Sequence, residues 1–302
     1  MLLQKIKKYY KKKILLKALK QKIKIFFNMP FRKIRNHKYM EKLKSLHETE
    51  SCFSVNLNRK DYLGINLPLL ELDERGCIVL PHNCSRIMID IGTSINWPNS
   101  TDWLNRHPND STVIGIEPNI DAWLLPKALY FYAEHIDQLK GKSKTYLSKN
   151  ITNRLLFLPV AIANYDGYAT FNSNKDVGTS SLLESDHELF RETIVPTMKL
   201  SRLLAKIPDS IKYIEHLKID AQGFDLEILK SAEEMITKIA VITIEVAAEH
   251  EYKYAYSKND IYNYILMNNF KEIQNSNRYG SVSFINEKYK DDLTLIDYKI
   301  RV

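Results

Sequence analysis

The sequence has no long apolar run, and this bears on its relation to membranes. Nothing in its 302 residues approaches the roughly 18 consecutive apolar residues of a membrane-spanning helix. The longest early apolar clusters, at residues 14–16 and 25–27, are too short for the core of a secretory signal peptide. With 44% apolar and 26% charged residues, the composition is that of a globular protein, so we expect a cytoplasmic location.

Two further signatures are missing. The three cysteines, Cys52, Cys77 and Cys84, are an odd number whose spacing fits neither a zinc ribbon nor a redox-active CxxC pair. We therefore expect them to be reduced and structural. No G-x-G-x-x-G fingerprint is present, which argues against a nicotinamide-dependent oxidoreductase.

Acidic residues are absent from the first 40 residues, which contain 14 Lys or Arg. Without this segment the chain has 30 basic residues and 36 acidic ones, a net charge of −6. Residues 1–16 place apolar side chains on one helical face and most lysines on the other, which predicts a basic amphipathic helix. Three roles remain open for this arm: peripheral binding to the anionic inner face of a membrane, a solvated tail, or contact with nucleic acid.

The pattern along the chain predicts three parts. Residues 1–50 form the basic arm and a linker, residues 51–85 a poorly defined lead-in, and residues 86–302 the main domain. Short buried apolar runs in the main domain predict strands at 87–91, 113–117, 155–163, 216–220 and 240–246. The segments between them predict helices at 99–107, 121–139, 201–207, 225–236 and 259–269.

The end of the chain differs from this alternation. Residues 281–287 and 294–300, separated by a turn-rich segment, predict a closing antiparallel strand pair. The whole pattern indicates an α/β fold, with a doubly wound, mostly parallel sheet followed by this pair and preceded by the helical arm. Ligands of such sheets bind outside the carboxyl ends of the strands, so functional residues are expected there.

Acidic residues close the first two predicted strands. Asp90 is followed by Gly92, and Glu117 is followed by Pro118 and Asn119. A carboxylate at the end of the second strand, here Glu117, can accept hydrogen bonds from both ribose hydroxyls of a nucleotide-like ligand. The alternative is that each carboxylate caps the helix that follows it.

The segment at 214–232, IEHLKIDAQGFDLEILKSA, is the most informative stretch. Strand alternation places His216, Lys218 and Asp220 on one side, and polar residues on one side of a buried strand need a reason. Gln222 and Gly223 form the following turn, and Asp225 can cap the next helix. A local ion pair between Lys218 and Asp220 is the structural alternative.

Taken together, these motifs resemble the FkbM-type S-adenosylmethionine-dependent methyltransferases. The resemblance runs from about Arg86 to Val246. It rests on the order and spacing of several pieces: DIGTSIN, VIGIEPN, PVAIANYDGYATF, GTSSL, VPTMKLSRLL, LKIDAQGFDLEILKSA and ITIEV. The family implies a Rossmann-like domain and O-methylation of a hydroxyl, often on a sugar, glycan or polyketide product.

The resemblance also implies roles for particular residues. The methionine and ribose part of the cofactor would contact Asp90, Gly92, Ser94 and Asn96. Glu117 would bind the ribose hydroxyls, with Pro118, Asn119 and Ala161 around the adenine. Lys218, Asp220 and Gln222 would face the transferred methyl and the acceptor, with Ser180 and Ser181 nearby.

The first loop departs from the family pattern. Family members typically have DxGxNxG, whereas this chain has Ser94 in place of the asparagine and Asn96 in place of the second glycine. Asparagine is the least costly replacement if that glycine has a left-handed conformation. The segment after the loop offers Pro98 as a first helical residue and residues 99–101 as caps. We expect a reshaped loop that still binds the cofactor, and the alternative is a disabled site.

Methyl transfer requires an aligned acceptor and removal of its proton. Asp220 is a candidate base, but orientation of the acceptor suits an ordinary aspartate better, and His216, Glu245 or His250 could be the base instead. Asp220 and Glu245 could share a magnesium ion, although no dedicated ligand cluster is evident. Two alternatives of other classes are an inactive scaffold of a membrane-surface glycan-assembly complex and a nucleotide-sugar glycosyltransferase.

Overall fold

The computed structural model describes residues 70–93, 98–119, 153–175, 177–245, 251–273 and 281–293. Three predicted features lie outside these ranges: the basic arm, the helix at 121–139 and the strand at 294–300. No helix among the described residues is long and apolar enough to cross a membrane.

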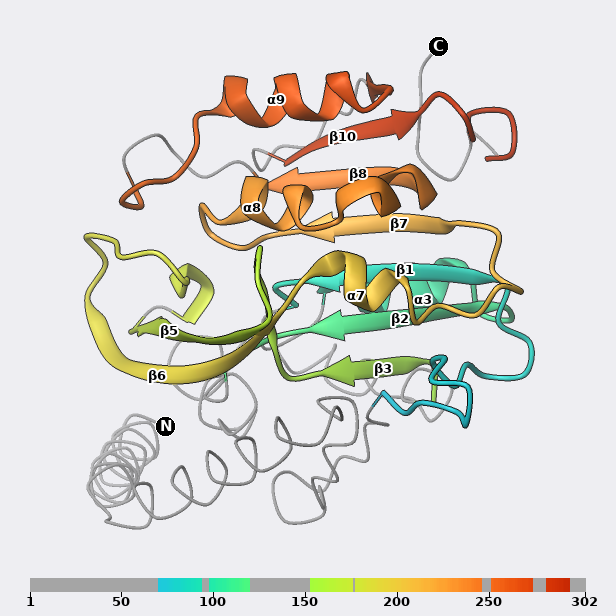
Figure 1. Cartoon of the computed structure of the whole chain (residues 1–302), viewed down its shortest axis with the longest axis horizontal. Coiled ribbons are helices and arrows are strands. Elements are labelled where there is room, and N and C mark those ends of the chain that lie inside the picture. The colour runs from blue at the N-terminus through green and yellow to red at the C-terminus, as the bar shows by residue number, and fades with distance from the viewer. Residues whose placement is uncertain are drawn as a thin grey trace, which may run out of the picture. The chain divides into compact units, whose positions relative to one another are not determined.

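A seven-stranded sheet forms the centre of the fold, in the order β3-β2-β1-β7-β8-β10-β9 (Figure 1). Its parallel strands are β1 (Arg86–Ile91), β2 (Ser111–Ile116), β3 (Leu155–Leu158), β7 (Ile214–Ile219) and β8 (Ile239–Glu245). Nearly every residue of β1, β2, β3 and β8 is buried, which explains their continuous apolar runs. The predicted doubly wound α/β sheet is confirmed.

Helices lie on both faces of this sheet. Figure 1 shows α7 (Leu200–Leu204), α8 (Asp225–Lys230) and α9 (Lys258–Met267) in front of the sheet and α3 (Pro98–Arg106) behind it. Helix α9 begins with a capping box, in which the Asp260 amide donates to Ser257 Oγ and the Ser257 amide donates to the Asp260 carboxylate. The helix predicted at 225–236 is shorter than expected. It ends at Lys230, and a 3-10 helix (Glu233–Lys238) follows, with Glu233 at a φ of +53°.

The antiparallel pair near the end of the sequence exists, but with a different partner. Strand β10 (Ser281–Asn286) pairs with β8 on one side and with β9 (Phe270–Ile273) on the other. Both edges of β10 are therefore occupied. Residues 294–300, the expected partner, lie outside the described residues.

The strand predicted at 155–163 is two strands in two different sheets. Strand β3 ends at Leu158, and β4 (Ala161–Ile162) belongs to a three-stranded sheet of order β4-β6-β5. Pro159 separates them, and the amide of Val160 donates to the Leu158 carbonyl at 3.0 Å in a tight turn. The sequence pattern did not predict the two long strands of this second sheet, β5 (Gly167–Asn174) and β6 (Leu189–Met198).

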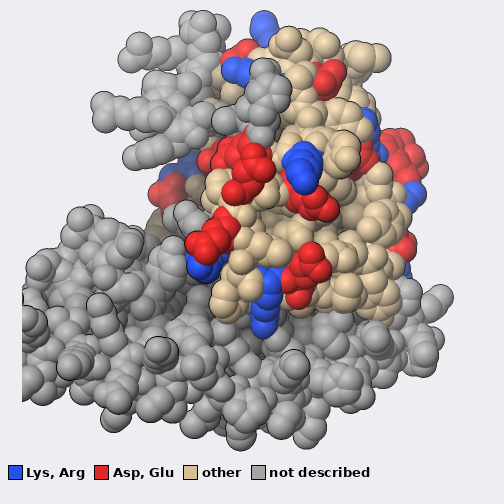
Figure 2. All heavy atoms as spheres, turned by 90° about the vertical axis from the view of Figure 1, so that its left-hand side faces the viewer, with Lys and Arg blue, Asp and Glu red and all other residues tan. Residues whose placement is uncertain are grey.

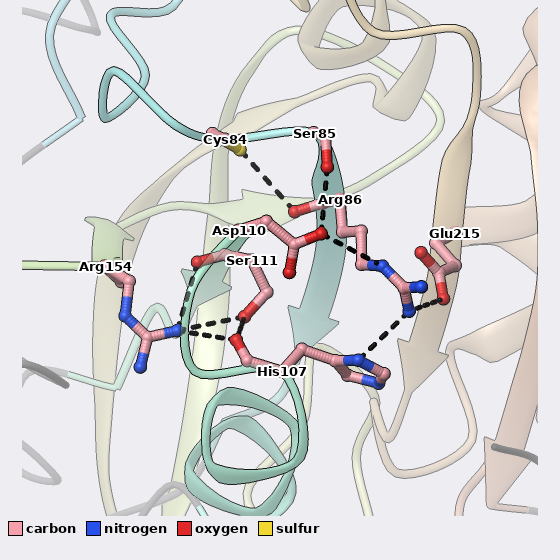
Figure 3. A network of polar contacts seen from close by, with 8 residues as sticks. All are labelled: Cys84, Ser85, Arg86, His107, Asp110, Ser111, Arg154 and Glu215. Atoms are coloured by element: carbon pink, nitrogen blue, oxygen red, sulfur yellow. Dashed lines mark hydrogen bonds and ion pairs between the residues drawn. The ribbon is translucent and has the colours of Figure 1, made fainter.

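Ion pairs tie together the amino ends of the parallel strands (Figure 3). Arg86 lies 3.1 Å from Glu215 Oε1, 3.0 Å from His107 Nδ1 and 3.3 Å from Asp110 Oδ2. Arg154 donates to the His107 carbonyl and to Ser111 Oγ, each at 3.0 Å. These contacts join the starts of β1, β2, β3 and β7.

Candidate functional site

The strand order reverses between β1 and β7, which are neighbours although β2 to β6 lie between them in sequence. Such a switch point leaves a crevice at the carboxyl ends of the two strands. Figure 2 looks onto this face, where acidic and basic side chains are interspersed around an uncharged surface. The predicted site residues at the ends of β1 and β7 meet here.

Gly92 brings the two strand ends into direct contact. Its φ is +76°, and a Cβ at this position would lie 1.9 Å from the Asp220 carbonyl oxygen. The Asp220 amide in turn donates to the Ile91 carbonyl at 3.0 Å. Only glycine fits, because a Cβ would clash with the Asp220 backbone and any other residue would be strained at this φ.

Asp90 lies at the carboxyl end of β1, with 1% of its surface exposed. Its Oδ2 accepts a hydrogen bond from Ser100 Oγ at 2.5 Å, and its Oδ1 lies 3.7 Å from Lys218 Nζ and has no hydrogen-bond partner. Ser100 lies within α3, which begins at Pro98, so its hydroxyl anchors the helix to Asp90. Burial raises the pKa of Asp90, although the Lys218 ammonium and the Ser100 bond act against it.

Lys218 is buried behind the strand ends. Its ammonium donates to Asp220 Oδ2 at 3.0 Å and to the Gly92 carbonyl at 3.4 Å. Burial acts to lower its pKa, but the Asp90 and Asp220 carboxylates more than offset this, so the pKa lies above the ordinary value. The alternative of a local ion pair is thus realised. The same pair also fixes one oxygen of Asp220.

The turn after β7 fixes the other oxygen. Gln222 Nε2 donates to Asp220 Oδ1 at 2.6 Å, while Gln222 Oε1 accepts from Tyr252 at 2.7 Å. Asp225 is the first residue of α8, and its carboxylate accepts from the amides of Ala221 and Gly223 in the preceding turn. Burial raises the pKa of Asp225 to about 6.

Glu245 ends β8 and is partly buried beside Asp220. Burial, together with the charge and hydrogen bonding of Asp220, raises the pKa of Glu245 to about 7. His216 differs: its Nε2 lies 2.8 Å from Thr243 Oγ1, and burial lowers its pKa to about 3. A neutral imidazole two residues back along β7, about 6–7 Å from Lys218, is poorly placed to act as a base. His250 lies outside the described residues.

Glu117 and Asn119 follow β2. Glu117 is buried, and its Oε1 accepts from the Asn119 amide at 2.8 Å. The Asn119 side chain reaches the second sheet, where its Nδ2 lies 3.4 Å from Ser180 Oγ. Ser181 Oγ, in the same GTSSL segment, donates to the Gln222 carbonyl at 2.8 Å. The second sheet is thus joined to the turn after β7, which we call the KIDAQG turn after residues 218–223.

A pocket lies between these groups, and its lining combines polar and apolar side chains. The polar side chains come from four predicted positions, Glu117, Ser180, Asp220 and Gln222. Nine apolar residues form the other walls: Ile91, Val160, Ala161, Ile162, Phe171, Leu182, Ala221, Phe224 and Ile228. Gly92 and Pro118 also line the pocket, whereas Asp90, Asn119, Lys218 and Glu245 do not.

Some predicted residues are not placed, and others were not predicted. Ser94 and Asn96 lie outside the described residues, so the predicted change in the loop stays a prediction. Phe171 and Phe224 were not predicted, because nothing in their local pattern distinguishes them from core residues. Tyr252 was missed because it lies 30 residues from its partner Gln222. Among the described residues, no cluster of three or more His, Cys, Asp or Glu side chains could hold a metal ion.

A family model described as the methyltransferase FkbM domain matches residues 90–273. The chain belongs to the FkbM methyltransferase family. The expected membership is confirmed, and the match begins at Asp90, covers the whole pocket and ends with β9. No curated protein matches the chain.

Two solved structures are similar to this FkbM chain. One is the crystal structure of methyltransferase FkbM from Methylobacillus flagellatus KT, with 18% identity and a TM-score of 0.39. It covers 68% of this chain, which spans only 45% of that protein. The other is TrmK of M. capricolum in complex with S-adenosyl-homocysteine, with 13% identity, a TM-score of 0.32 and coverage of 73% and 70%.

Proposed function

We propose that this chain uses S-adenosylmethionine to methylate a hydroxyl group of a sugar, a glycan or a related metabolite. One observation carries the proposal: at the switch point, a pocket wall presents the Asp220 carboxylate with one oxygen bonded to Lys218 and the other to Gln222. A carboxylate held in one orientation is suited to align an acceptor hydroxyl. Membership of the FkbM family supports methyl transfer as the reaction.

The residues present fit the cofactor. The apolar walls around Ala161, Phe171 and Phe224 suit a flat adenine ring, and the buried Glu117 suits the ribose hydroxyls. Gly92, which lines the pocket, would lie beside the methionine part. Asp90, whose Oδ1 has no hydrogen-bond partner, would support this end of the site from β1, with Ser94 and Asn96 in the same loop. When bound, S-adenosylmethionine supplies a methyl group activated by its sulfonium.

The carboxylates at the strand ends divide the remaining work. Asp220 would accept a hydrogen bond from the acceptor hydroxyl and orient it. Glu245, which lies beside Asp220 and whose pKa of about 7 matches neutral pH, would take the proton that the acceptor hydroxyl releases. Glu245 is only partly buried, so it can return the proton to solvent.

Isothermal titration tests the cofactor site. We expect micromolar binding of S-adenosylmethionine and no binding of NADH. Each charge-assisted hydrogen bond contributes about 1.5–3 kcal/mol, so Glu117→Ala should weaken binding by more than about tenfold. Glu287→Ala, at an exposed carboxylate paired with Lys290, is the matched control and should bind like the wild type. Equal affinity in Glu117→Ala and the control would refute the ribose assignment.

Transfer of labelled methyl groups to hydroxylated glycan acceptors tests the reaction. Glu245→Gln should abolish most turnover near neutral pH, because an amide cannot take the proton. Unchanged turnover in Asp220→Asn would remove Asp220 from the mechanism. If the protein binds S-adenosylmethionine but methylates no acceptor, the alternative of an inactive scaffold would be favoured.

A further inference from the structure

Tyr252 lies directly against the KIDAQG turn although it comes from the segment after β8. Only 2% of its surface is exposed. Its hydroxyl lies 2.7 Å from Gln222 Oε1 and 3.0 Å from the Thr179 carbonyl. A hydroxyl has one proton, and the contact with Gln222 is the shorter of the two. That proton is therefore assigned to Gln222 Oε1.

The backbone of the turn is packed against the same tyrosine. Gln222 has a φ of +53°, which is unusual for a residue other than glycine. The next residue, Gly223, has a φ of +91°, and a Cβ there would lie 3.1 Å from the Cβ atoms of both Tyr252 and Ala255. Tyr252 thus supports an unfavourable turn conformation and bonds the side chain that this turn presents.

The hydrogen bonds form a continuous series. Tyr252 donates to Gln222 Oε1, Gln222 Nε2 donates to Asp220 Oδ1, and Lys218 donates to Asp220 Oδ2. The Tyr252 bond holds the Gln222 amide with its nitrogen towards Asp220. With both oxygens bonded, the Asp220 carboxylate has one orientation at the pocket wall.

We propose that Tyr252 is a positioning residue, whose hydroxyl fixes the Gln222 amide and, through it, the Asp220 carboxylate. The role in turnover rests on the proposed function, because it requires Asp220 to align an acceptor. The hydrogen-bonded connection itself does not. The two parts can be tested separately.

The kinetic test compares Tyr252→Phe with Tyr256→Phe. Tyr256 lies on the same segment and donates a bond of equal length, 2.7 Å, to Glu227 outside the pocket lining. Misalignment of a reacting group costs up to about 100-fold in rate, so Tyr252→Phe should lower kcat by about 10–100-fold while leaving the Kd for S-adenosylmethionine unchanged. Tyr256→Phe should retain wild-type kcat.

A double-mutant cycle separates positioning from a structural role. If Tyr252 acts through Gln222, the variant combining Tyr252→Phe with Gln222→Leu should have the same kcat as Gln222→Leu alone. A double variant whose loss of kcat equals the product of the two single losses would overturn the proposal. A lower Tm for Tyr252→Phe with unchanged kcat would do the same. If Tyr252→Phe does not fold, the same cycle is run with Tyr252→His in its place. A loss of kcat in that double variant equal to the product of the single losses would likewise overturn the proposal.

Nuclear magnetic resonance of protein labelled with ¹⁵N at glutamine side chains gives a readout that needs no turnover. The Gln222 signal, assigned by its loss in Gln222→Leu, should shift in Tyr252→Phe and stay in place in Tyr256→Phe. If the wild type methylates nothing but the signal shifts, the proposed function fails and the connection stands. An unchanged signal would overturn the connection.

Discussion

Among the glycines that the structure describes, Gly92 leaves the least room for a side chain. A Cβ there would coincide with the Asp220 carbonyl, so Gly92→Ala must separate the ends of β1 and β7. We expect a loss of stability of several kcal/mol and a loss of S-adenosylmethionine binding, measured by chemical unfolding and titration.

Gly76 provides a matched control for this prediction. It has the same φ of +76°, but a Cβ at this position would approach only the flexible end of Lys206, at 3.3 Å. Gly76→Ala should therefore cost only about 1–2 kcal/mol for the left-handed backbone and leave binding intact. Equal effects at the two glycines would show that the contact with Asp220 is unimportant.

Glu245 should make stability depend on pH. Its pKa is raised from 4.5 to about 7 on folding, so its favourable contribution is complete below pH 4.5 and is lost as the pH rises through 7. Glu245→Gln has no such titration. The Tm of the variant minus the Tm of the wild type, measured by calorimetry, should therefore be a few degrees larger at pH 8 than at pH 5. A difference that is constant with pH would contradict the raised pKa.

Helices α7 and α8 are joined through one hydroxyl. The buried Ser231 Oγ accepts from the Leu200 amide at 3.0 Å, at the start of α7, and donates to the Ile228 carbonyl at 2.7 Å in α8. Ser231→Ala leaves a buried amide without an acceptor, which should cost about 1–3 kcal/mol in chemical unfolding. Thr237→Ala, which removes an exposed hydroxyl bond to the Glu234 carbonyl, should cost less than about 0.5 kcal/mol.

The parallel strands could be predicted because burial on both faces makes their sequences largely apolar, as in β1 and β8. Strands β5 and β6 could not, because polarity and burial do not match in them. The buried half of β5 is mostly polar, and the exposed half of β6 contains the apolar Leu189, Phe190 and Ile194. The run at 155–163 was misassigned for a different reason. Its composition is continuous, and only the missing amide of Pro159 marks the change of sheet.

The site was predictable where one local motif contains it. Asp90, Glu117 and the 218–222 segment each end a recognisable strand, and parallel topology brings strand ends together. Tyr252 and Phe171 could not be found this way. Their contacts with the pocket depend on how the second sheet and the segment after β8 are placed, and no periodicity in the sequence encodes that placement.

The charge of the entire chain is unevenly distributed, and this leads to a prediction about membranes. Each Lys or Arg near an anionic bilayer contributes about 1 kcal/mol, and the first 40 residues hold 14 of them. We expect the full chain to float with phosphatidylserine vesicles at low salt, and to dissociate at high salt.

A full-length variant tests the same prediction without removing any residue. Its six lysines at positions 5, 7, 8, 11, 12 and 13 are replaced by glutamine. The variant keeps eight Lys or Arg in the first 40 residues, so it should float less with the anionic vesicles and dissociate from them at a lower salt concentration. Neither protein should bind phosphatidylcholine vesicles. Equal flotation of the two proteins would assign the attraction to another part of the chain.

The change of sheet at Pro159 has a consequence for engineering. Leu158 pairs in the large sheet and Ala161 in the small one, so two residues of backbone separate β3 from the pocket wall formed by Ala161 and Ile162. Side-chain substitutions along the walls would therefore alter shape and polarity but leave this spacing unchanged. Redesign for a bulkier cofactor analogue should begin with the length of this connection, and only then turn to libraries at the lining positions.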